Sequence, residues 1–398
     1  MFFPTRPCIC AGRIALLFAL SGALTAPALA QVSITEFALP SVTSSPQGIT
    51  PGPDGNVWFT EYGGDRIGRI TPTGSVTEFK IPTASSESNA IVTGPDGNLW
   101  FTERYGNRIG RVTVGGKVTE YRLPASGSRP LGITVGPDHN LWFTEYDGNR
   151  IGHVTTTGTF TEFTLPNAGS GPGSITVGPD GNLWFTEYDG NRIGSITLDG
   201  SFTEFAIPTP GSQPNGLTIG PDDALWSAER HGGKVLRIDT EGGITEFPLP
   251  SNSAEPANIT VGPDGNLWCV ERNAGNIARV TLAGNVTEFP IPTANSQPMN
   301  ITTGPDGNLW FTEFATSQIR RASITTADCV GDCDMSGSVT VDEILTLVNI
   351  ALGGALVSAC EAGDGNHDQE ISIDEILAAV TNALDGCSAS GTSSRRGA

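Results

Sequence analysis

Gly178-Pro-Asp-Gly-Asn-Leu-Trp-Phe-Thr-Glu187 is one copy of a unit that repeats through most of this 398-residue chain. Its Gly-Pro-Asp turn begins seven times, always 42 residues after the previous one, at Gly52, Gly94, Gly136, Gly178, Gly220, Gly262 and Gly304. Each of the seven tryptophans lies six residues after one of these glycines. No insertion interrupts the period between residues 31 and 324, so the sequence predicts a repeat fold.

Each repeat is predicted to form four short strands. They are typified by Gly-Ile-Thr-Val, Asn-Leu-Trp-Phe-Thr-Glu, Arg-Ile-Gly-Arg-Ile-Thr and Val-Thr-Glu-Phe. β-Branched and aromatic residues fill these segments, and Gly, Pro, Asn and Asp fill the turns between them. Four strands in about 40 residues are typical of a propeller blade. The predicted fold class is therefore mainly β, a seven-bladed β-propeller followed by a small α-helical domain.

The two ends of the repeat region are complementary. The last repeat stops at Ile324 without a Thr-Glu-aromatic strand, whereas Thr35-Glu36-Phe37 precedes the first Gly-Pro-Asp turn. We therefore expect the N-terminal strand to complete blade 7 and remove an open sheet edge. An open β-solenoid is the competing architecture, and it leaves these complementary ends unexplained.

Residues 1–30 are predicted to be a signal peptide. Arg6 and Arg13 precede an apolar run over residues 14–26, which is too short to span a bilayer, and Ala28-Leu29-Ala30 fits a cleavage site. A buried strand or helix is the alternative interpretation. The signal peptide predicts a secreted, cell-surface or periplasmic protein whose mature chain begins at Gln31. No later segment resembles a membrane-spanning helix.

The rest of the chain divides into three predicted segments: the propeller over 31–326, a calcium-binding module over 327–387, and a disordered tail rich in Ser and Gly over 388–398. The formal net charge is −20, which disfavours binding to nucleic acid or anionic membranes. In an oxidising compartment four cysteines can form two disulfides, with the pairing left open, among Cys329, Cys333, Cys360 and Cys387. Cys269 is expected to be a small buried hydrophobic residue.

The motif Asn-Leu-Trp-Phe-Thr-Glu, followed by Asn-Arg-Ile-Gly, resembles the streptogramin B lyase (virginiamycin B lyase) family of seven-bladed propellers over residues 31–325. The resemblance implies the fold of a carbon–oxygen lyase. In that family, histidines in Pro-His loops of the last two blades contact substrate and act as general base, and two glutamates serve a magnesium site. The matching positions here are Ala257, Met299, Gln297 and Glu313. Neither Ala nor Met can abstract a proton, which disfavours the family's elimination chemistry by this mechanism and leaves open whether the chain is an enzyme.

The strand order predicts that one face carries the glutamates that end each second strand, around the propeller mouth. They are Glu61, Glu103, Glu145, Glu187, Glu229, Glu271 and Glu313. A base follows five residues later in blades 1 to 5, but blades 6 and 7 have Asn276 and Gln318 at this position. Glu271 and Glu313 are therefore candidates for acid–base chemistry or a magnesium site. The alternative is that Arg272, Arg320 or Arg321 compensates their charge.

Of the histidines, His231 is the candidate for chemistry. It lies two residues after Glu229, and such a pair can share a metal or move a proton. A solvated histidine is the simpler alternative. His139 and His153 are expected to be surface substitutions.

Two acidic loops follow the propeller, over residues 332–343 and 364–375. Their spacing fits the calcium loop of an EF-hand, and each loop leads into a predicted helix that begins Asp-Glu-Ile-Leu. Gln369 replaces the usual glycine of the second loop. The predicted calcium ligands are Asp332, Asp334, Ser336, Ser338, Thr340 and Glu343 in the first loop, and Asp364, Asn366, Asp368, Glu370, Ser372 and Glu375 in the second.

This duplication resembles a type I dockerin, which implies a cohesin-like partner. Glu at the last loop position and the surrounding cysteines depart from that family. A self-contained calcium module, packed on the propeller or attached to a cell-surface protein, is the alternative. Three functions therefore compete: a ligand- or partner-binding scaffold, a lyase with a rearranged metal site, and a component of an extracellular polysaccharide-degrading assembly.

Overall fold

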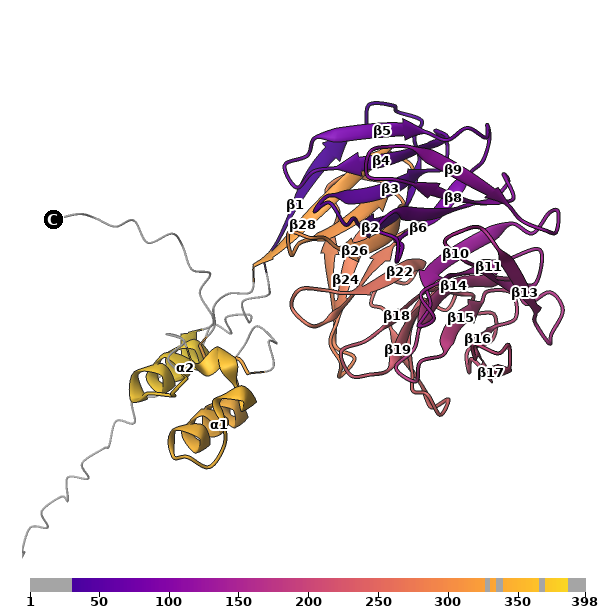
Figure 1. Ribbon diagram of the computed structural model, residues 1–398. Coiled ribbons are helices and arrows are strands. Elements are labelled where there is room, and N and C mark those ends of the chain that lie inside the picture. Colours follow the sequence, from indigo (N-terminus) through magenta and orange to yellow (C-terminus); the bar gives the residue numbers. More distant parts are fainter. Residues whose placement is uncertain (1–30, 326–329, 334–338, 365–368, 386–398) are drawn as a thin grey trace, which may run out of the picture. The chain divides into compact units, whose positions relative to one another are not determined.

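The protein is described by a computed structural model that covers residues 31–325, 330–333, 339–364 and 369–385. Two compact units are present, one within residues 30–326 and one formed by the C-terminal region (Figure 1). The predicted signal peptide, the predicted tail, Cys329 and Cys387 lie outside the described residues. Among the described helices, none has the length and apolar character needed to cross a membrane.

The larger unit is a ring of seven four-stranded antiparallel sheets, as the repeat predicts. Blades 1 to 3 are β2(Pro46–Pro51), β3(Val57–Glu61), β4(Arg66–Ile70) and β5(Val76–Lys80); β6(Ser88–Thr93), β7(Leu99–Glu103), β8(Arg108–Val112) and β9(Val118–Arg122); and β10(Pro130–Val135), β11(Leu141–Glu145), β12(Arg150–Val154) and β13(Phe160–Thr164). Blades 4 to 6 are β14(Pro172–Val177), β15(Leu183–Glu187), β16(Arg192–Ile196) and β17(Phe202–Ala206); β18(Pro214–Ile219), β19(Leu225–Glu229), β20(Lys234–Ile238) and β21(Ile244–Pro248); and β22(Pro256–Val261), β23(Leu267–Glu271), β24(Asn276–Val280) and β25(Val286–Pro290).

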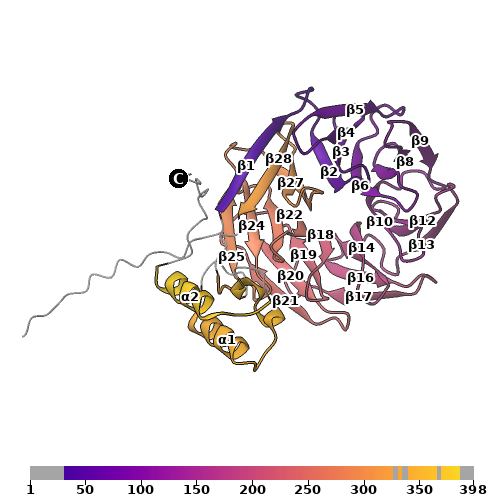
Figure 2. The same cartoon turned by 60° about the vertical axis from the view of Figure 1, so that its left-hand side comes forward.

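Blade 7 closes the ring with strands from both ends of the repeat region. It contains β26(Pro298–Thr303), β27(Leu309–Glu313), β28(Gln318–Thr325) and β1(Gln31–Ala38). β1 pairs antiparallel with β28 from Gln31 opposite Thr325 to Ala38 opposite Gln318. Figure 2 shows β1 beside β28, with the blades arranged in chain order around the ring. The prediction that the N-terminal strand completes blade 7 is confirmed.

Each blade is held by a tryptophan and the aspartate of its Gly-Pro-Asp turn. In blade 1, Trp58 is fully buried and stacks on Phe79 with ring centroids 5.4 Å apart. Its indole N–H donates to Asp54 Oδ1 at 2.9 Å, and Arg69 forms a 3.5 Å ion pair with the same carboxylate. These hydrogen bonds lower the pKa of Asp54 against the opposing effect of its burial. The Gly-Pro-Asp turns are therefore structural, on the face opposite the mouth.

His153 takes the place of this arginine in blade 3. Its imidazole Nε2 lies 3.1 Å from Asp138 Oδ2, and the ring lies against Trp142 at 5.0 Å between centroids. The expectation that His153 is a plain surface substitution misses this role, because the repeat places it beside the aspartate. Cys269 is fully buried, as predicted.

The smaller unit contains α1(Val341–Ala351), α2(Ile373–Asp385) and two 3₁₀ turns, η1(Val357–Ala359) and η2(Glu361–Gly363). Leu347, Ile350, Cys360, Ile371 and Ala379 form its core, and a disulfide joins Cys333 to Cys360. Both predicted helices are present.

Candidate functional site

A cavity of about 290 Å³ lies at the mouth of the propeller, where the first strands of the blades surround the axis. Its walls are lined by Gln47, Asn89, Leu131, Gly173, Asn215, Asn258, Met299 and Asn300 from these strands, and by Arg104, Tyr146, Tyr188 and Arg230 above them. The first strands contribute mainly amide and small side chains. The upper wall contributes guanidinium and phenol groups.

The upper wall belongs to a ring of residues that we call the rim. Each rim residue directly follows the glutamate that ends a second strand: Tyr62, Arg104, Tyr146, Tyr188, Arg230, Arg272 and Phe314. Neighbouring rim residues contact each other across blades. Arg104 Nη1 donates to the Tyr62 hydroxyl at 3.4 Å, and Arg230 Nη1 donates to the Tyr188 hydroxyl at the same distance. The sequence signal that we missed is this alternation of Tyr, Phe and Arg at one position of the repeat.

Acidic groups hold parts of the rim from outside the cavity. Glu255 Oε2 lies 3.7 Å from both Arg230 Nη2 and Arg272 Nη1. Burial and the nearby Arg230 charge lower the pKa of Arg272. The Tyr146 hydroxyl donates to Asp189 Oδ2 at 2.6 Å, and burial together with this carboxylate raises the pKa of that phenol. Tyr146 therefore remains a protonated donor at neutral pH.

The positions that carry histidine in the resembling lyases hold no base here. Ala257 is buried at 2% exposure, and Met299 lines the cavity. The Gln297 side-chain oxygen accepts a hydrogen bond from Arg272 Nη2 at 3.2 Å. Among the described residues that line the cavity, none is acidic and none is histidine. The cavity can therefore bind through amide, guanidinium, phenol and thioether groups, but its walls offer no general base of the carboxylate or imidazole type.

The seven glutamates lie below the rim instead of lining the mouth. All seven are fully buried at the ends of the second strands. In six blades a buried serine from the loop before the first strand lies at the same repeat position near this glutamate: Ser44, Ser86, Ser128, Ser170, Ser212 and Ser296. The expectation that these carboxylates surround the mouth is wrong, because their side chains are fully buried and none of them lines the cavity.

Burial raises the pKa of these glutamates. The values are about 7 for Glu61, about 8 for Glu103, about 6 for Glu187, and about 8 for both Glu229 and Glu271. In blades 1, 3 and 4 the base that follows the glutamate bridges it to the glutamate of the fourth strand, whereas in blades 2 and 5 the base pairs with the fourth-strand glutamate alone. In blade 3, Arg150 Nη2 lies 2.9 Å from Glu145 and its Nε lies 3.4 Å from Glu162. Of the pairs predicted in blades 1 to 5, the ion pair between this glutamate and its base is therefore present in blades 1, 3 and 4.

Blades 6 and 7 differ from the others. Arg320 Nε lies 3.0 Å from Glu313 Oε1, so Arg320 compensates the charge of Glu313. Glu271 receives a hydrogen bond from Asn276 Nδ2 at 2.9 Å instead. Of the other two proposed compensating residues, Arg272 pairs with Glu255 and Arg321 pairs with Asp306.

His231 and Glu229 are not brought together at an accessible site. His231 is exposed on the turn after β19, whereas Glu229 is fully buried. Lys234 pairs with Glu246 of the same blade at 2.8 Å. The structure therefore favours the simpler interpretation of His231 as a solvated side chain.

The described residues of the two acidic loops include buried carboxylates. Asp332, Glu343, Asp364 and Glu375 are 5–8% exposed. In the first loop the Glu343 carboxylate accepts hydrogen bonds from the Thr340 backbone N–H at 2.7 Å and the Thr340 hydroxyl at 2.8 Å. Ser372 makes the same two contacts with Glu375 at 2.8 and 2.9 Å. The predicted ligands outside the described residues are Asp334, Ser336, Ser338, Asn366 and Asp368.

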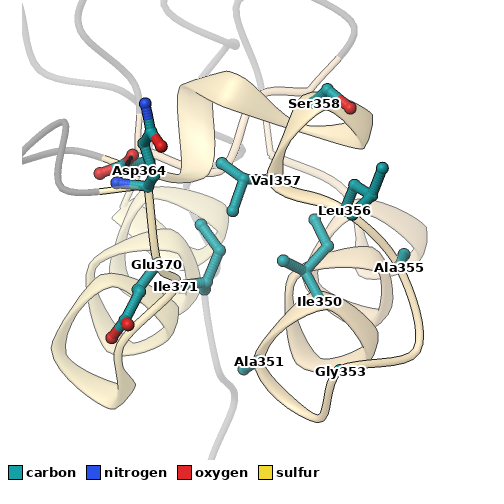
Figure 3. A pocket seen from close by; sticks show the side chains of 11 residues that line it. Ile350, Ala351, Gly353, Ala355, Leu356, Val357, Ser358, Asp364, Glu370 and Ile371 are labelled. Carbon is teal, nitrogen blue, oxygen red and sulfur yellow. Dashed lines mark hydrogen bonds between the residues drawn. The ribbon is translucent and has the colours of Figure 1, made fainter.

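A cavity of about 760 Å³ lies beside the second loop. Asp364 and Glu370 lie on one side of it, and Ile350 and Leu356 lie on the other (Figure 3). In the part of the chain that the structure describes, no group of three or more His, Cys, Asp or Glu side chains has the geometry of a metal site.

The propeller is similar to solved lyase structures over its whole length. Virginiamycin B lyase from Staphylococcus aureus is 42% identical, with a TM-score of 0.71, and the match covers 74% of this chain and 100% of that chain. A catalytically inactive form of that enzyme with quinupristin gives the same values. A virginiamycin B lyase from Bacillus licheniformis is 46% identical over 44 residues, which is 11% of this chain and 15% of that relative.

More distant likenesses concern the fold alone. The extracellular domain of a putative hybrid two-component system from B. thetaiotaomicron is 16% identical with a TM-score of 0.60, and covers 74% of this chain and 42% of that chain. The sequence profile of the virginiamycin B lyase family matches residues 26–168 and 133–340. With that profile spanning every blade, and with the seven-bladed fold and the solved relatives in agreement, this chain belongs to the virginiamycin B lyase family.

Proposed function

We propose that the propeller is a binding module whose mouth holds a small anionic or carbonyl-rich ligand, and that it does not perform the family's elimination reaction. The observation that carries this proposal is the cavity wall, which combines arginine, tyrosine and amide side chains and has no acid or histidine among its described residues. Ala257 and Met299 support it, because neither side chain can take a proton.

Arg104 and Arg230 give this wall its chemistry. Their guanidinium groups donate to phenol oxygens and present further N–H groups, and Arg donors bind carboxylates in a fixed planar geometry. Tyr146 and Tyr188 place two aromatic rings beside them, with centroids 6.4 Å apart. An aromatic carboxylate matches this combination of cationic and aromatic groups.

The binding proposal is tested with benzoate as the probe, by calorimetric titration. Loss of one charge-assisted hydrogen bond costs about 1.5–3 kcal/mol, so Arg230→Met should weaken benzoate binding roughly 10- to 100-fold. Lys117→Met is the matched control, because Lys117 is exposed on a turn outside the cavity. Equal benzoate affinity of the two variants would contradict a ligand site at the mouth.

The proposed absence of the elimination reaction is tested by incubating the protein with quinupristin and magnesium. Liquid chromatography then shows whether the peptide ring has opened. We expect the peptide to remain intact with the natural chain. A variant with Ala257→His, Met299→His and Gln297→Glu restores the residue types that the family resemblance implies, and any ring opening should appear only there. Magnesium-dependent turnover by the natural chain, lost in Glu313→Gln, would support the alternative of a lyase with a rearranged site.

We also propose that the C-terminal unit binds calcium through its two acidic loops. Four carboxylates there are nearly buried, and residues 327–387 contain no lysine or arginine to offset them. Asp332, Glu343, Asp364 and Glu375 would supply hard oxygen ligands, together with the loop residues between them. Calcium would neutralise the loops and hold the starts of α1 and α2. Titration of calcium into the chelated chain and into a Glu343→Gln, Glu375→Gln variant tests this.

The partner that we propose for this unit is a cohesin-like or other cell-surface protein, met after export. The two helices expose apolar side chains at equivalent positions: Val341 and Leu345 on α1, and Ile373 and Leu377 on α2, with 57–76% exposure. Exposed apolar groups of this kind favour a protein interface. Calcium-dependent binding of a purified cohesin module, lost in Val341→Asp with Ile373→Asp, would support a role in an extracellular polysaccharide-degrading assembly.

A further inference from the structure

Blade 5 shows where a cation lies between two glutamates. Lys234 Nζ contacts Glu246 Oε2 at 2.8 Å and Thr209 Oγ1 at 2.5 Å. The Glu229 carboxylate lies fully buried at the end of the adjacent strand, where β19 pairs Glu229 with Lys234. The ammonium group thus contacts oxygen atoms of Glu246 and Thr209, while Glu229 lies beside it on the paired strand.

Blade 6 keeps these oxygen groups and loses the ammonium. Forty-two residues further along the chain, Glu229, Glu246 and Thr209 become Glu271, Glu288 and Ser251, whereas Lys234 becomes Asn276. Ser251 Oγ lies 2.8 Å from Glu288 Oε2, and Asn276 Nδ2 lies 2.9 Å from Glu271 Oε2 and 3.4 Å from Ser251 Oγ. The four side chains therefore converge through these hydrogen bonds, and Ser251 contacts Glu288 as Thr209 contacts Glu246 in blade 5.

No other side chain in the described residues replaces the missing positive charge. In blade 7 Arg320 supplies it from the third strand, but the equivalent residue of blade 6 is Ala278, which is fully buried. The serine that accompanies the glutamate elsewhere is Ala254 here. Among the described ion pairs, none involves Glu271 or Glu288.

Glu271 has one carboxylate oxygen that no hydrogen bond within this group uses. Its side chain is fully buried, and Oε1 has no hydrogen-bond partner among the described residues. An unpaired carboxylate oxygen in the interior is costly, because burial removes its water and no donor replaces it. A cation bound from solution would compensate the charge of this carboxylate and coordinate its unpaired oxygen.

We propose that blade 6 binds one calcium ion between Glu271 and Glu288, beside the position that the Lys234 ammonium takes in blade 5. Glu271 and Glu288 supply two negative charges, and Ser251 Oγ supplies a third side-chain ligand. A 180° turn of the Asn276 amide presents its oxygen as a fourth ligand, and water completes the set. Calcium suits this site because it accepts irregular sets of six to eight oxygen atoms, whereas magnesium requires a near-ideal octahedron and holds its own water. This site is separate from the mouth and from the acidic C-terminal loops.

The test uses Asn276→Lys in the full chain, with calcium per chain measured by elemental analysis and calorimetry in buffer containing potassium chloride. The variant copies blade 5, so we expect it to fold and to bind one calcium fewer than the natural chain. Lys234→Asn is the reverse change, and we expect it to bind one calcium more. Lys117→Asn, on an exposed turn, is the control and should change nothing.

Two further results separate this site from others. The Glu343→Gln, Glu375→Gln variant should keep the blade 6 ion, and Glu271→Gln should weaken that ion at least tenfold. Unchanged calcium content in Asn276→Lys would overturn the proposal and would leave a proton shared by the two carboxyl groups as the explanation. A response to potassium alone would also overturn the calcium assignment.

Discussion

Replacing Arg320 with methionine tests whether a buried ion pair holds the closed ring together. The Arg320 side chain is 2% exposed and lies between Glu313, which is fully buried, and Glu36 on the N-terminal strand. Its Nη1 lies 2.7 Å from Glu36 Oε2 and its Nε lies 3.0 Å from Glu313 Oε1. Methionine keeps most of the side-chain volume and removes the charge, so the variant leaves the Glu313 carboxylate without its cation.

The expected loss is large. Removing one partner of a buried ion pair lowers the free energy of unfolding by about 3–5 kcal/mol. This is a substantial part of the 5–15 kcal/mol that is typical of folded proteins. The loss should depend on pH. Burial already raises the pKa of Glu313 while Arg320 opposes that effect. Without Arg320 the folded-state pKa rises further, so stability falls by up to about 1.4 kcal/mol per pH unit as pH rises above the unfolded value. The cost is therefore smaller at pH 5 than at pH 8.

Urea unfolding followed by tryptophan fluorescence measures this effect, since all seven tryptophans lie in the propeller. Adding Glu313→Gln to Arg320→Met should recover much of the loss at pH 8, because no charge is then left buried. Arg321→Met is the control: Arg321 is more exposed and lies 3.9 Å from Asp306, so its loss should cost about 1 kcal/mol. Equal losses for the two arginines, or a loss from Arg320→Met that is the same at both pH values, would refute the reasoning.

Three other variants probe separate parts of the structure. A Cβ on Gly110 would lie 2.1 Å from the Phe101 ring, so Gly110→Ala should destabilise the propeller by about 1–3 kcal/mol in urea unfolding. Burial and the nearby Glu120 charge raise the pKa of Glu103 from 4.5 to about 8, so stability should fall as pH rises between these values, and Glu103→Gln should reduce that slope. Cys333→Ser opens a disulfide between residues 27 apart in sequence, and should cost the smaller unit about 3 kcal/mol in helical circular dichroism melts; an unchanged melt would contradict a stabilising role.

The fold was predictable because the repeat carries redundant information. The constant interval of 42 residues fixes equivalent positions in every blade, and the complementary ends indicate how the ring closes. The unbroken run of buried residues along the second strands, such as Trp58 and Phe59, matches a strand with neighbours on both faces.

The site was less predictable because strand position does not fix which way a terminal side chain turns. Glu61 ends its strand beside the mouth, yet it is fully buried, while the next residue, Tyr62, forms part of the rim. The difference depends on the loop that brings Ser44 against the glutamate and on the irregular pairing between Pro46 and Ile49. Such contacts between loops and neighbouring blades are not encoded in the periodicity. Arg320, which compensates the charge of Glu313, also lies two residues after Gln318, the position at which the repeat places a base in blades 1 to 5.

The pairing of β1 with β28 also means that blade 7, and with it the ring, can close only late in the synthesis of the chain. Gln318 contacts Glu36 although the two residues are 282 positions apart. A ribosome must therefore deliver almost the entire ring before the first strand finds its partner, and closing so long a loop is slow. A nascent chain interrupted before residue 318 presents two unpaired sheet edges, which recruit other chains. Helper proteins that shield these edges until translation passes blade 7 would thus determine how much chain reaches the closed form.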